Sequence, residues 1–66
     1  MLQDEIGAKV RRLREAKGLS QEQLAVYSGL SVATVDSIER GIRNPTIETL
    51  QAIAETLDIA ASELFI

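Results

Sequence analysis

Apolar residues recur along the chain at the three- and four-residue spacing of α-helices. Ile6, Val10 and Leu13 stand at i, i+4 and i+7, and Gly18 follows them as a residue that can end a helix in the left-handed conformation. This pattern predicts a first helix over about residues 2 to 17. β-branched residues nowhere alternate with polar ones over the length of a strand, so no sheet is predicted.

Capping residues indicate where the next two helices begin. Ser20 and Gln23 have the spacing of a capping box, so a second helix is predicted over about residues 21 to 28. Ser31 is a suitable cap for a third helix over about residues 32 to 40. Each helix is followed by a glycine, which supports these ends.

The C-terminal third of the chain predicts two more helices. Thr46 can cap a fourth helix, and one apolar stripe is expected along it, made by Ile47, Leu50, Ile53, Ala54 and Leu57. A short last helix over about residues 61 to 65 would turn Leu64 toward the core. The pattern as a whole predicts a compact all-α domain of five helices that spans residues 1 to 66.

Composition narrows the chemistry that this domain can perform. The chain has 66 residues, enough for one small core, and it contains neither cysteine nor histidine. Disulfides, imidazole bases and the usual zinc ligands are therefore excluded, and no cofactor, metal or small-molecule substrate is expected. An enzyme that uses a carboxylate pair such as Glu48 and Glu55 is the weakest alternative, because both acids are expected on an exposed helix face.

Neither a membrane segment nor a signal peptide is evident. The apolar runs are only a few residues long, and Asp4 and Glu5 stand where a signal peptide would carry bases. A cytoplasmic protein is therefore expected.

The net charge of −3 conceals an uneven distribution along the chain. Residues 1 to 17 carry five bases and three acids, a sum of +2, whereas residues 46 to 66 carry four acids and no base, a sum of −4. A local field of this kind matters more for binding than the total charge does. The acidic total alone does not exclude a nucleic-acid partner.

The second and third helices have the residue types of a helix-turn-helix. A small residue, Ala25, allows two helices to cross closely, and Gly29 suits the sharp turn between them. Val35 and Ile38 would pack the next helix onto the core. The outer side of that helix, over residues 32 to 40, would then protrude with dimensions that match the major groove of DNA.

Several segments in register resemble the Cro and phage-repressor type of helix-turn-helix proteins, a family that includes restriction-modification controller proteins and antitoxins. The resemblance extends over about residues 6 to 65 and rests on IG (6–7), VRRLR (10–14), KGLSQEQLA (17–25), GLS (29–31), IERG (38–41) and RNPT (43–46). It implies a repressor-type fold and a sequence-specific transcriptional regulator that binds double-stranded DNA as a homodimer.

The resemblance also implies roles for individual residues. The positions expected to contact base edges are Ser31, Val32, Ala33 and Ser37. Those expected to contact phosphates are Gln21, Thr34, Arg40 and Arg43. Val32 and Ala33 offer only apolar contact, for example to a thymine methyl group, so direct readout should be modest. The nearby charge of Asp36 would repel phosphates unless it accepts from a cytosine amine or points away.

Two further pairs of residues are given structural roles by the resemblance. Arg14 and Glu39 are expected to form a partly buried ion pair that fixes the third helix against the first. Phe65 and Ile66 are expected to form the dimer interface. In the alternative for Phe65, its side chain folds back into the core.

A second functional hypothesis remains open at this point. A protein-interaction module of the same fold, such as an antitoxin-like or co-regulator domain, would bind DNA weakly or not at all. The sequence pI near 4.7 and the surface made by Val32, Ala33 and Asp36 favour it.

Overall fold

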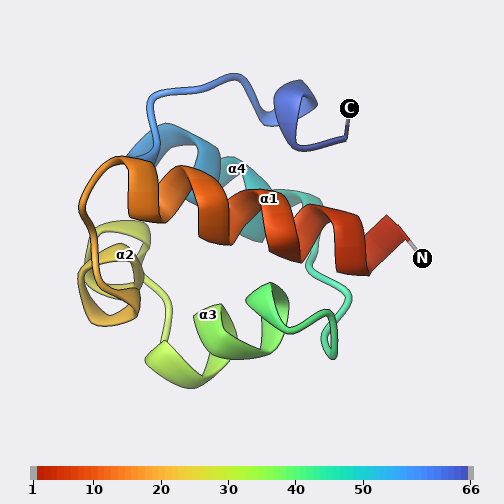
Figure 1. Ribbon diagram of the computed structural model, residues 1–66, viewed down its shortest axis with the longest axis horizontal. Helices are drawn as coiled ribbons and strands as arrows, with labels where there is room; N and C mark the ends of the chain where they lie inside the picture. Colours follow the sequence, from red (N-terminus) through yellow and green to blue (C-terminus); the bar gives the residue numbers. More distant parts are fainter. Residues whose placement is uncertain (1, 66) are drawn as a thin grey trace.

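Four α-helices and one short 3-10 helix make up the fold (Figure 1). A computed structural model describes residues 2–65. The elements, in chain order, are α1 (Leu2–Ala16), α2 (Gln21–Ser28), α3 (Val32–Glu39), α4 (Ile47–Thr56) and η1 (Ala61–Phe65). The all-α class is confirmed within these residues, but the α-helices number four instead of five.

The fifth predicted helix is the 3-10 helix η1, which is five residues long. The backbone N–H of Glu63 donates to the carbonyl oxygen of Ala60 at 2.9 Å, across the three-residue span typical of this tighter helix. The Glu63 carboxylate in turn accepts from the Ala60 N–H at 3.0 Å. This short segment therefore forms hydrogen bonds over three residues instead of the four-residue span of an α-helix.

Side-chain caps define where the middle helices begin. The Ser20 hydroxyl accepts from the Gln23 N–H at 3.0 Å, and the Gln23 side chain accepts from the Ser20 N–H at 2.8 Å, so the predicted capping box is confirmed. Ser31 and Thr46 each accept from a backbone N–H three residues later. Gly29 ends α2 with a φ of 71°, a conformation that glycine adopts without strain.

All five elements contribute to one aliphatic core. Its buried members are Ile6, Val10, Leu24, Ala25, Val35, Ile38, Leu50, Ile53, Ala54, Leu57 and Leu64. Ile47 is an exception to the predicted stripe, because its side chain is 75% exposed. It is the first residue of α4, and the core begins one turn later at Leu50.

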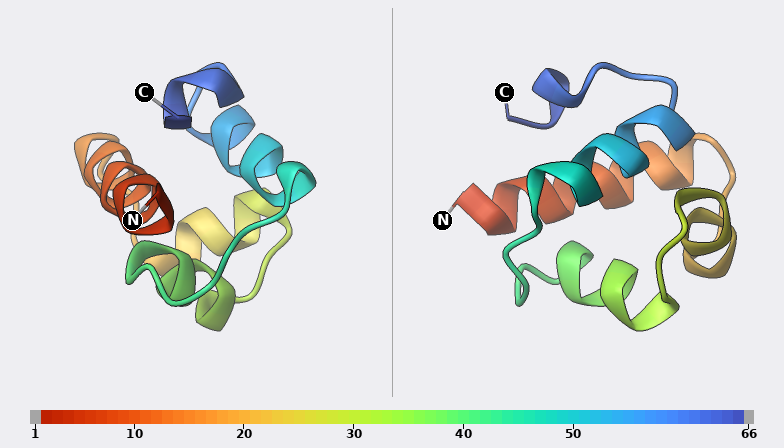
Figure 2. Two further views of the ribbon diagram at one scale, coloured as in Figure 1. Left: turned by 90° about the vertical axis from the view of Figure 1, so that its right-hand side faces the viewer. Right: turned by 180° about the vertical axis from the view of Figure 1, so that it is seen from behind.

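Helix α1 lies between α3 on one side and η1 on the other (Figures 1 and 2). α3 packs against both α1 and α2, so it is supported from two directions. α2 also packs against α4. α3 lies at the edge of the molecule in Figure 1 and in the view from behind in Figure 2. Its outer side therefore faces solvent while its inner side is packed.

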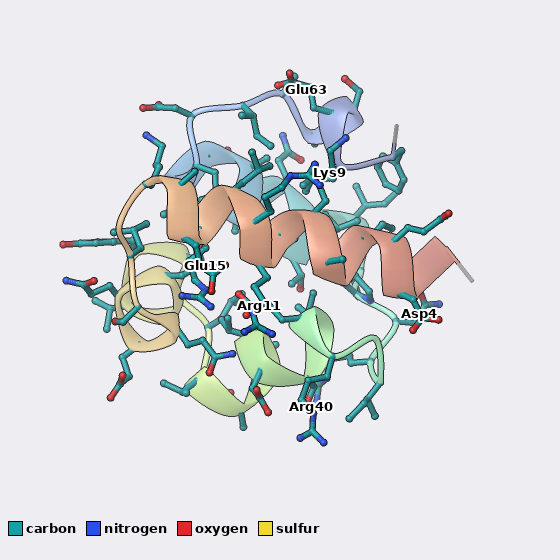
Figure 3. All side chains as sticks on the ribbon, viewed as in Figure 1. Asp4, Lys9, Arg11, Glu15, Arg40 and Glu63 are labelled. Atoms are coloured by element: carbon teal, nitrogen blue, oxygen red, sulfur yellow. The ribbon has the colours of Figure 1, made fainter. Side chains whose placement is uncertain are left out.

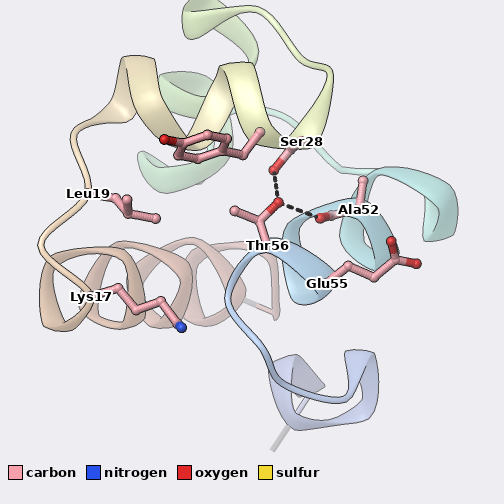
Figure 4. A pocket seen from close by; sticks show the side chains of 7 residues that line it. Lys17, Leu19, Ser28, Ala52, Glu55 and Thr56 are labelled. Carbon is pink, nitrogen blue, oxygen red and sulfur yellow. Dashed lines mark hydrogen bonds between the residues drawn. The ribbon is translucent and has the colours of Figure 1, made fainter.

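A chain of hydroxyl groups joins the end of α2 to α4 (Figure 4). The Thr56 hydroxyl donates to the Ala52 carbonyl oxygen at 3.1 Å, and the Ser28 hydroxyl lies 3.0 Å from the Thr56 hydroxyl. Because the Thr56 hydroxyl uses its hydrogen on a carbonyl of its own helix, it is the acceptor in the bond with Ser28. This link fixes the first helix of the helix-turn-helix against the C-terminal half of the domain.

Candidate nucleic-acid interface

The predicted base-reading residues occupy the beginning and the outer side of α3. Ser31, Val32 and Ala33 are exposed, and Ser37 is half-buried one turn after Ala33 on the same side of the helix. The opposite side of α3 carries Val35 and is buried in the core. The structure therefore places these four positions together on one solvent-facing surface.

Four predicted phosphate-contacting residues surround this surface at two levels of exposure. Gln21 begins α2 and Thr34 lies in the first turn of α3, and both are half-buried. Arg40 and Arg43 follow α3 and are exposed. Figure 3 shows the Arg40 side chain extending from the end of α3 away from the rest of the molecule.

Two of these four side chains, Gln21 and Arg40, contact Asp36. Gln21 Nε2 donates to Asp36 Oδ1 at 3.2 Å and to Glu39 Oε1 at 3.1 Å. Arg40 Nη1 donates to Asp36 Oδ2 at 3.4 Å. The four-residue spacing of Asp36 and Arg40 was visible in the sequence as a helical ion pair. The Gln21 contacts join two helices and required the tertiary structure.

Arg14 and Glu39 form a bidentate ion pair between α1 and α3. Arg14 Nε lies 2.6 Å from Glu39 Oε2, and Nη2 lies 3.1 Å from Oε1. The side chains are only 10% and 2% exposed. Arg14 Nη1 also donates to the carbonyl oxygen of Leu19 at 2.7 Å, so the same guanidinium holds the loop before α2.

Hydrogen bonds stabilise the charged forms of both Arg14 and Glu39. The hydrogen bond to Glu39 raises the pKa of Arg14 above its usual range, against the opposing effect of burial. Among the described residues, every buried side-chain nitrogen or oxygen has a hydrogen-bond partner. The guanidinium therefore stays charged at any physiological pH, and the pair is a fixed link between two helices.

Gly7 allows α1 and α3 to approach each other closely. A β-carbon on Gly7 would overlap the carbonyl oxygen of Ile38 and lie within hard contact of the Glu39 backbone. No role was predicted for this glycine from the sequence. A signal was present, because a glycine inside a helix costs about 1 kcal/mol relative to alanine and indicates a packing constraint.

Of the two predicted dimer residues, the structure describes Phe65, which lies away from α3. Phe65 belongs to η1, across α1 from α3 in Figure 1, and its side chain is 48% exposed, so it is not a core residue. Ile66 lies outside the described residues. Ile47, exposed at the start of α4, adds a second large apolar side chain on an element that packs against η1.

A hollow of about 660 Å³ lies between α2 and α4. Figure 4 shows the side chains around it, with Glu55 as its one carboxylate. Glu48 is not among the lining residues, so the acid pair considered from the sequence does not meet there. Within residues 2–65 no group of three or more acidic or metal-ligating side chains could hold a metal ion.

Helix length and hydropathy also bear on membrane insertion. Of the helices that the structure describes, none is both long enough and apolar enough to span a bilayer.

Comparison with known proteins places this geometry in a family. The model of the helix-turn-helix family matches residues 10–64. The HTH-type transcriptional regulator y4dJ of Sinorhizobium fredii is 44% identical over 59 residues, which cover 89% of this chain and 77% of that protein. Several other curated relatives are longer, and the chain spans 40% to 43% of their length.

Solved structures agree with the sequence relatives. The crystal structure of the restriction-modification controller protein C.AhdI from Aeromonas hydrophila superposes with a TM-score of 0.93 at 46% identity and covers 96% of both chains. The biofilm regulator SinR, solved in complex with DNA, superposes with a TM-score of 0.88 at 32% identity, over 92% of this chain and 98% of that one. This chain belongs to the helix-turn-helix family of Cro and phage-repressor type, whose members are transcriptional regulators.

Proposed function

We propose that this protein is a sequence-specific DNA-binding transcriptional regulator that inserts α3 into the major groove. One observation carries the proposal. The first two residues of α3, Val32 and Ala33, are exposed, while the same helix is fixed from behind by the buried pair of Arg14 and Glu39. A helix that is rigid on one side and open on the other is the arrangement that groove reading requires.

Base readout rests on small side chains. Ser37 supplies a hydroxyl group for hydrogen bonds to base edges. The Ser31 hydroxyl caps α3 and donates to the Thr34 hydroxyl at 2.9 Å, so it has one lone pair left to accept from a base amine. Val32 and Ala33 supply apolar contact to thymine methyl groups. None of the four is long enough for a bidentate contact of the arginine–guanine kind. Each base pair is therefore discriminated modestly, and total specificity depends on reading more than one site.

Phosphate contacts provide affinity and orientation. Arg40 and Arg43 lie beyond the end of α3, where the duplex backbone would pass, and Gln21 and Thr34 lie at the beginnings of α2 and α3. Side chains at these positions bind any sequence, because phosphates carry no base identity. They set the position of α3 in the groove.

Two copies of the chain would read an operator with two-fold symmetry. Phe65 and Ile66, with neighbours near the end of α4, are the proposed apolar centre of the dimer interface, and Glu55, Asp58 and Glu63 are its proposed rim. A homodimer places its two copies of α3 about 34 Å apart, one turn of the duplex. Such a protein acts on DNA in the cytoplasm.

Selection of bound duplexes from a random oligonucleotide pool tests the proposed function. The expected result is an enriched sequence with two inverted half-sites about 10 base pairs apart, centre to centre. Enrichment of a single half-site would retain DNA binding and reject the dimer. A pool that shows no enrichment at low salt would reject sequence-specific binding altogether.

The dimer is tested separately by sedimentation of the wild-type protein and of Phe65→Asp. Wild type is expected to dimerise in the micromolar range, and Phe65→Asp to remain a folded monomer that binds one half-site weakly. Val26→Asp is the matched control, because Val26 is 75% exposed on α2, away from η1. Equal loss of dimer in both variants, or a monomeric wild type with and without DNA, would contradict the proposed interface.

A protein-interaction module remains the second candidate, supported by the acidic pI of 4.7 and by the carboxylate on the outer side of α3. If the protein is an interaction module, it should not shift random DNA in a gel. If it is a DNA-binding regulator, it should shift random DNA in a salt-sensitive way.

A further inference from the structure

We propose that Asp36 is a positioning residue that suppresses binding to non-operator DNA by competing with phosphates for Gln21 and Arg40. The inference rests on the proposed DNA-binding function and adds a determinant of specificity to it. Both oxygens of the Asp36 carboxylate are engaged in the free protein. Oδ1 accepts from Gln21 at 3.2 Å and Oδ2 accepts from Arg40 at 3.4 Å.

The position of this carboxylate makes the competition direct. Asp36 lies on α3 one residue before Ser37, and its side chain is 41% exposed. Its two partners are residues that the proposed interface uses for phosphates, one from the beginning of α2 and one from the end of α3. While these bonds hold, Gln21 Nε2 and Arg40 Nη1 donate to Asp36, so a phosphate must compete for these two nitrogens.

The bonds to Asp36 are of a kind that DNA can replace. The Arg40 side chain is 65% exposed, and ion pairs between exposed side chains four residues apart are weak. By contrast, Gln21 keeps a second acceptor in Glu39, whose side chain is only 2% exposed. Approach of a duplex therefore releases Arg40 first, and the Asp36 charge is left without its cation beside the groove.

Every base pair carries one amine and several acceptors in the major groove, so the fate of that charge depends on which base of the facing pair lies opposite it. A cytosine or adenine amine donates to a carboxylate, whereas guanine N7 and O6 and thymine O4 offer only acceptors. On an operator with an amine at this position, Asp36 exchanges the Arg40 guanidinium for the base amine. On other sequences the carboxylate faces base acceptors without a cation and close to phosphates. Affinity for those sequences is lower, so this one acid discriminates between sites.

Asp36→Asn tests the proposal, because it removes the charge and keeps the shape of the side chain. Affinity is measured on a random duplex of about 20 base pairs and on the selected operator, from about 50 to about 200 mM salt. The variant is expected to bind random duplex roughly tenfold more tightly, with a salt slope steeper by about one counterion. Operator affinity should rise less, so that the operator-to-random ratio falls.

Glu55→Gln is the matched control. It removes one exposed acid from α4, beside the hollow between α2 and α4, and so changes net charge equally without touching α3. Its affinity for random duplex should change by less than about twofold, because exposed charges farther away than a Debye length of about 10 Å are screened. Asp36→Ala should shift affinity in the same direction as Asp36→Asn, and thermal melts of each variant establish that it is folded.

A double variant separates positioning from simple repulsion. If Asp36 acts by holding Arg40, the gain from Asp36→Asn should shrink severalfold in an Arg40→Ala background. An equal gain in both backgrounds would overturn the positioning role and leave only direct repulsion. If wild type binds its operator but Asp36→Asn binds random duplex no more tightly than Glu55→Gln does, the role of Asp36 is overturned and the proposed function stands. Failure of wild type to bind any duplex would overturn the proposed function and this inference with it.

Discussion

Glu39 and Asp36 are two carboxylates three residues apart on α3, and they face different surroundings. The Glu39 side chain is 2% exposed and forms a bidentate pair with Arg14 of α1. The Asp36 side chain is 41% exposed and forms a longer, single bond to Arg40, the residue that directly follows α3. The Gln21 amide touches both acids and marks the boundary between the inner and outer sides of α3.

The difference between the two sides shows how one helix meets opposite demands. A buried charge must keep its partner, because water is not there to replace it, so the inner pair gives α3 a fixed position. An exposed charge exchanges partners at little cost, so the outer side remains available for DNA. Helix α3 thus combines a permanent attachment with a replaceable one.

Removal of the inner carboxylate should give the largest effect. Glu39→Ala leaves the Arg14 guanidinium buried without its counter-ion, so the free energy of unfolding is expected to fall by about 3 kcal/mol. Asp36→Ala is the control on the same helix, with an expected loss of about 0.5 kcal/mol or less. Urea unfolding measures both. Equal losses of unfolding free energy in the two variants would contradict the claim that burial makes Glu39 more important for stability than Asp36.

The close approach behind α3 should give the next effect. Alanine in place of a helical glycine ordinarily stabilises a protein by up to about 1 kcal/mol, but Gly7→Ala puts a methyl group against the carbonyl oxygens of Ile38 and Glu39. We expect a net loss of about 2 kcal/mol in thermal unfolding, from overpacking. At the exposed neighbour, Ala8→Gly should cost only about 1 kcal/mol of helix propensity. A Gly7→Ala variant more stable than wild type would contradict the close contact.

Changes on the outer side should alter DNA binding and leave the fold intact. Arg40→Ala and Arg43→Ala are each expected to weaken binding to all sequences alike and to reduce the salt slope by about one counterion. The loss should be smaller for Arg40, because its phosphate contact forms only after the bond to Asp36 is broken.

Lys17→Ala is the control for these arginines. Lys17 also carries one positive charge, but its Nζ lies 3.2 Å from the Asp58 carboxylate, at the hollow between α2 and α4. Its replacement should leave the salt slope unchanged. An altered base preference in either arginine variant, with an unchanged slope, would refute the phosphate assignment.

Local chemistry explains why much of the fold could be predicted from the sequence. The capping box of Ser20 and Gln23 and the turn at Gly29 depend on residues a few positions apart, and both form as the sequence indicates. Ile47 shows the limit of this reasoning. Periodicity placed it on the apolar stripe of α4, but whether a stripe is covered depends on how far the neighbouring elements extend.

The sequence indicated the exposed start of α3 and one ion pair, but not the other contacts around α3. The resemblance brought Arg14 and Glu39 together across 25 residues of chain, and it placed Ser31 and Val32 on an exposed helix start. It did not indicate that Gln21 bonds to Asp36, because that contact depends on the angle between α2 and α3. Spacing along one chain does not determine such angles.

The central claim is that DNA contacts the outer side of α3 while the inner side holds the helix in place. Backbone amide shifts, followed by NMR during titration with the selected operator, test it most directly. The largest changes are expected at residues 21–23, 31–37 and 40–43, with small changes at Gly7, Arg14 and around the hollow between α2 and α4. Changes centred on that hollow, with residues 31–37 unaffected by saturating operator, would contradict the claim.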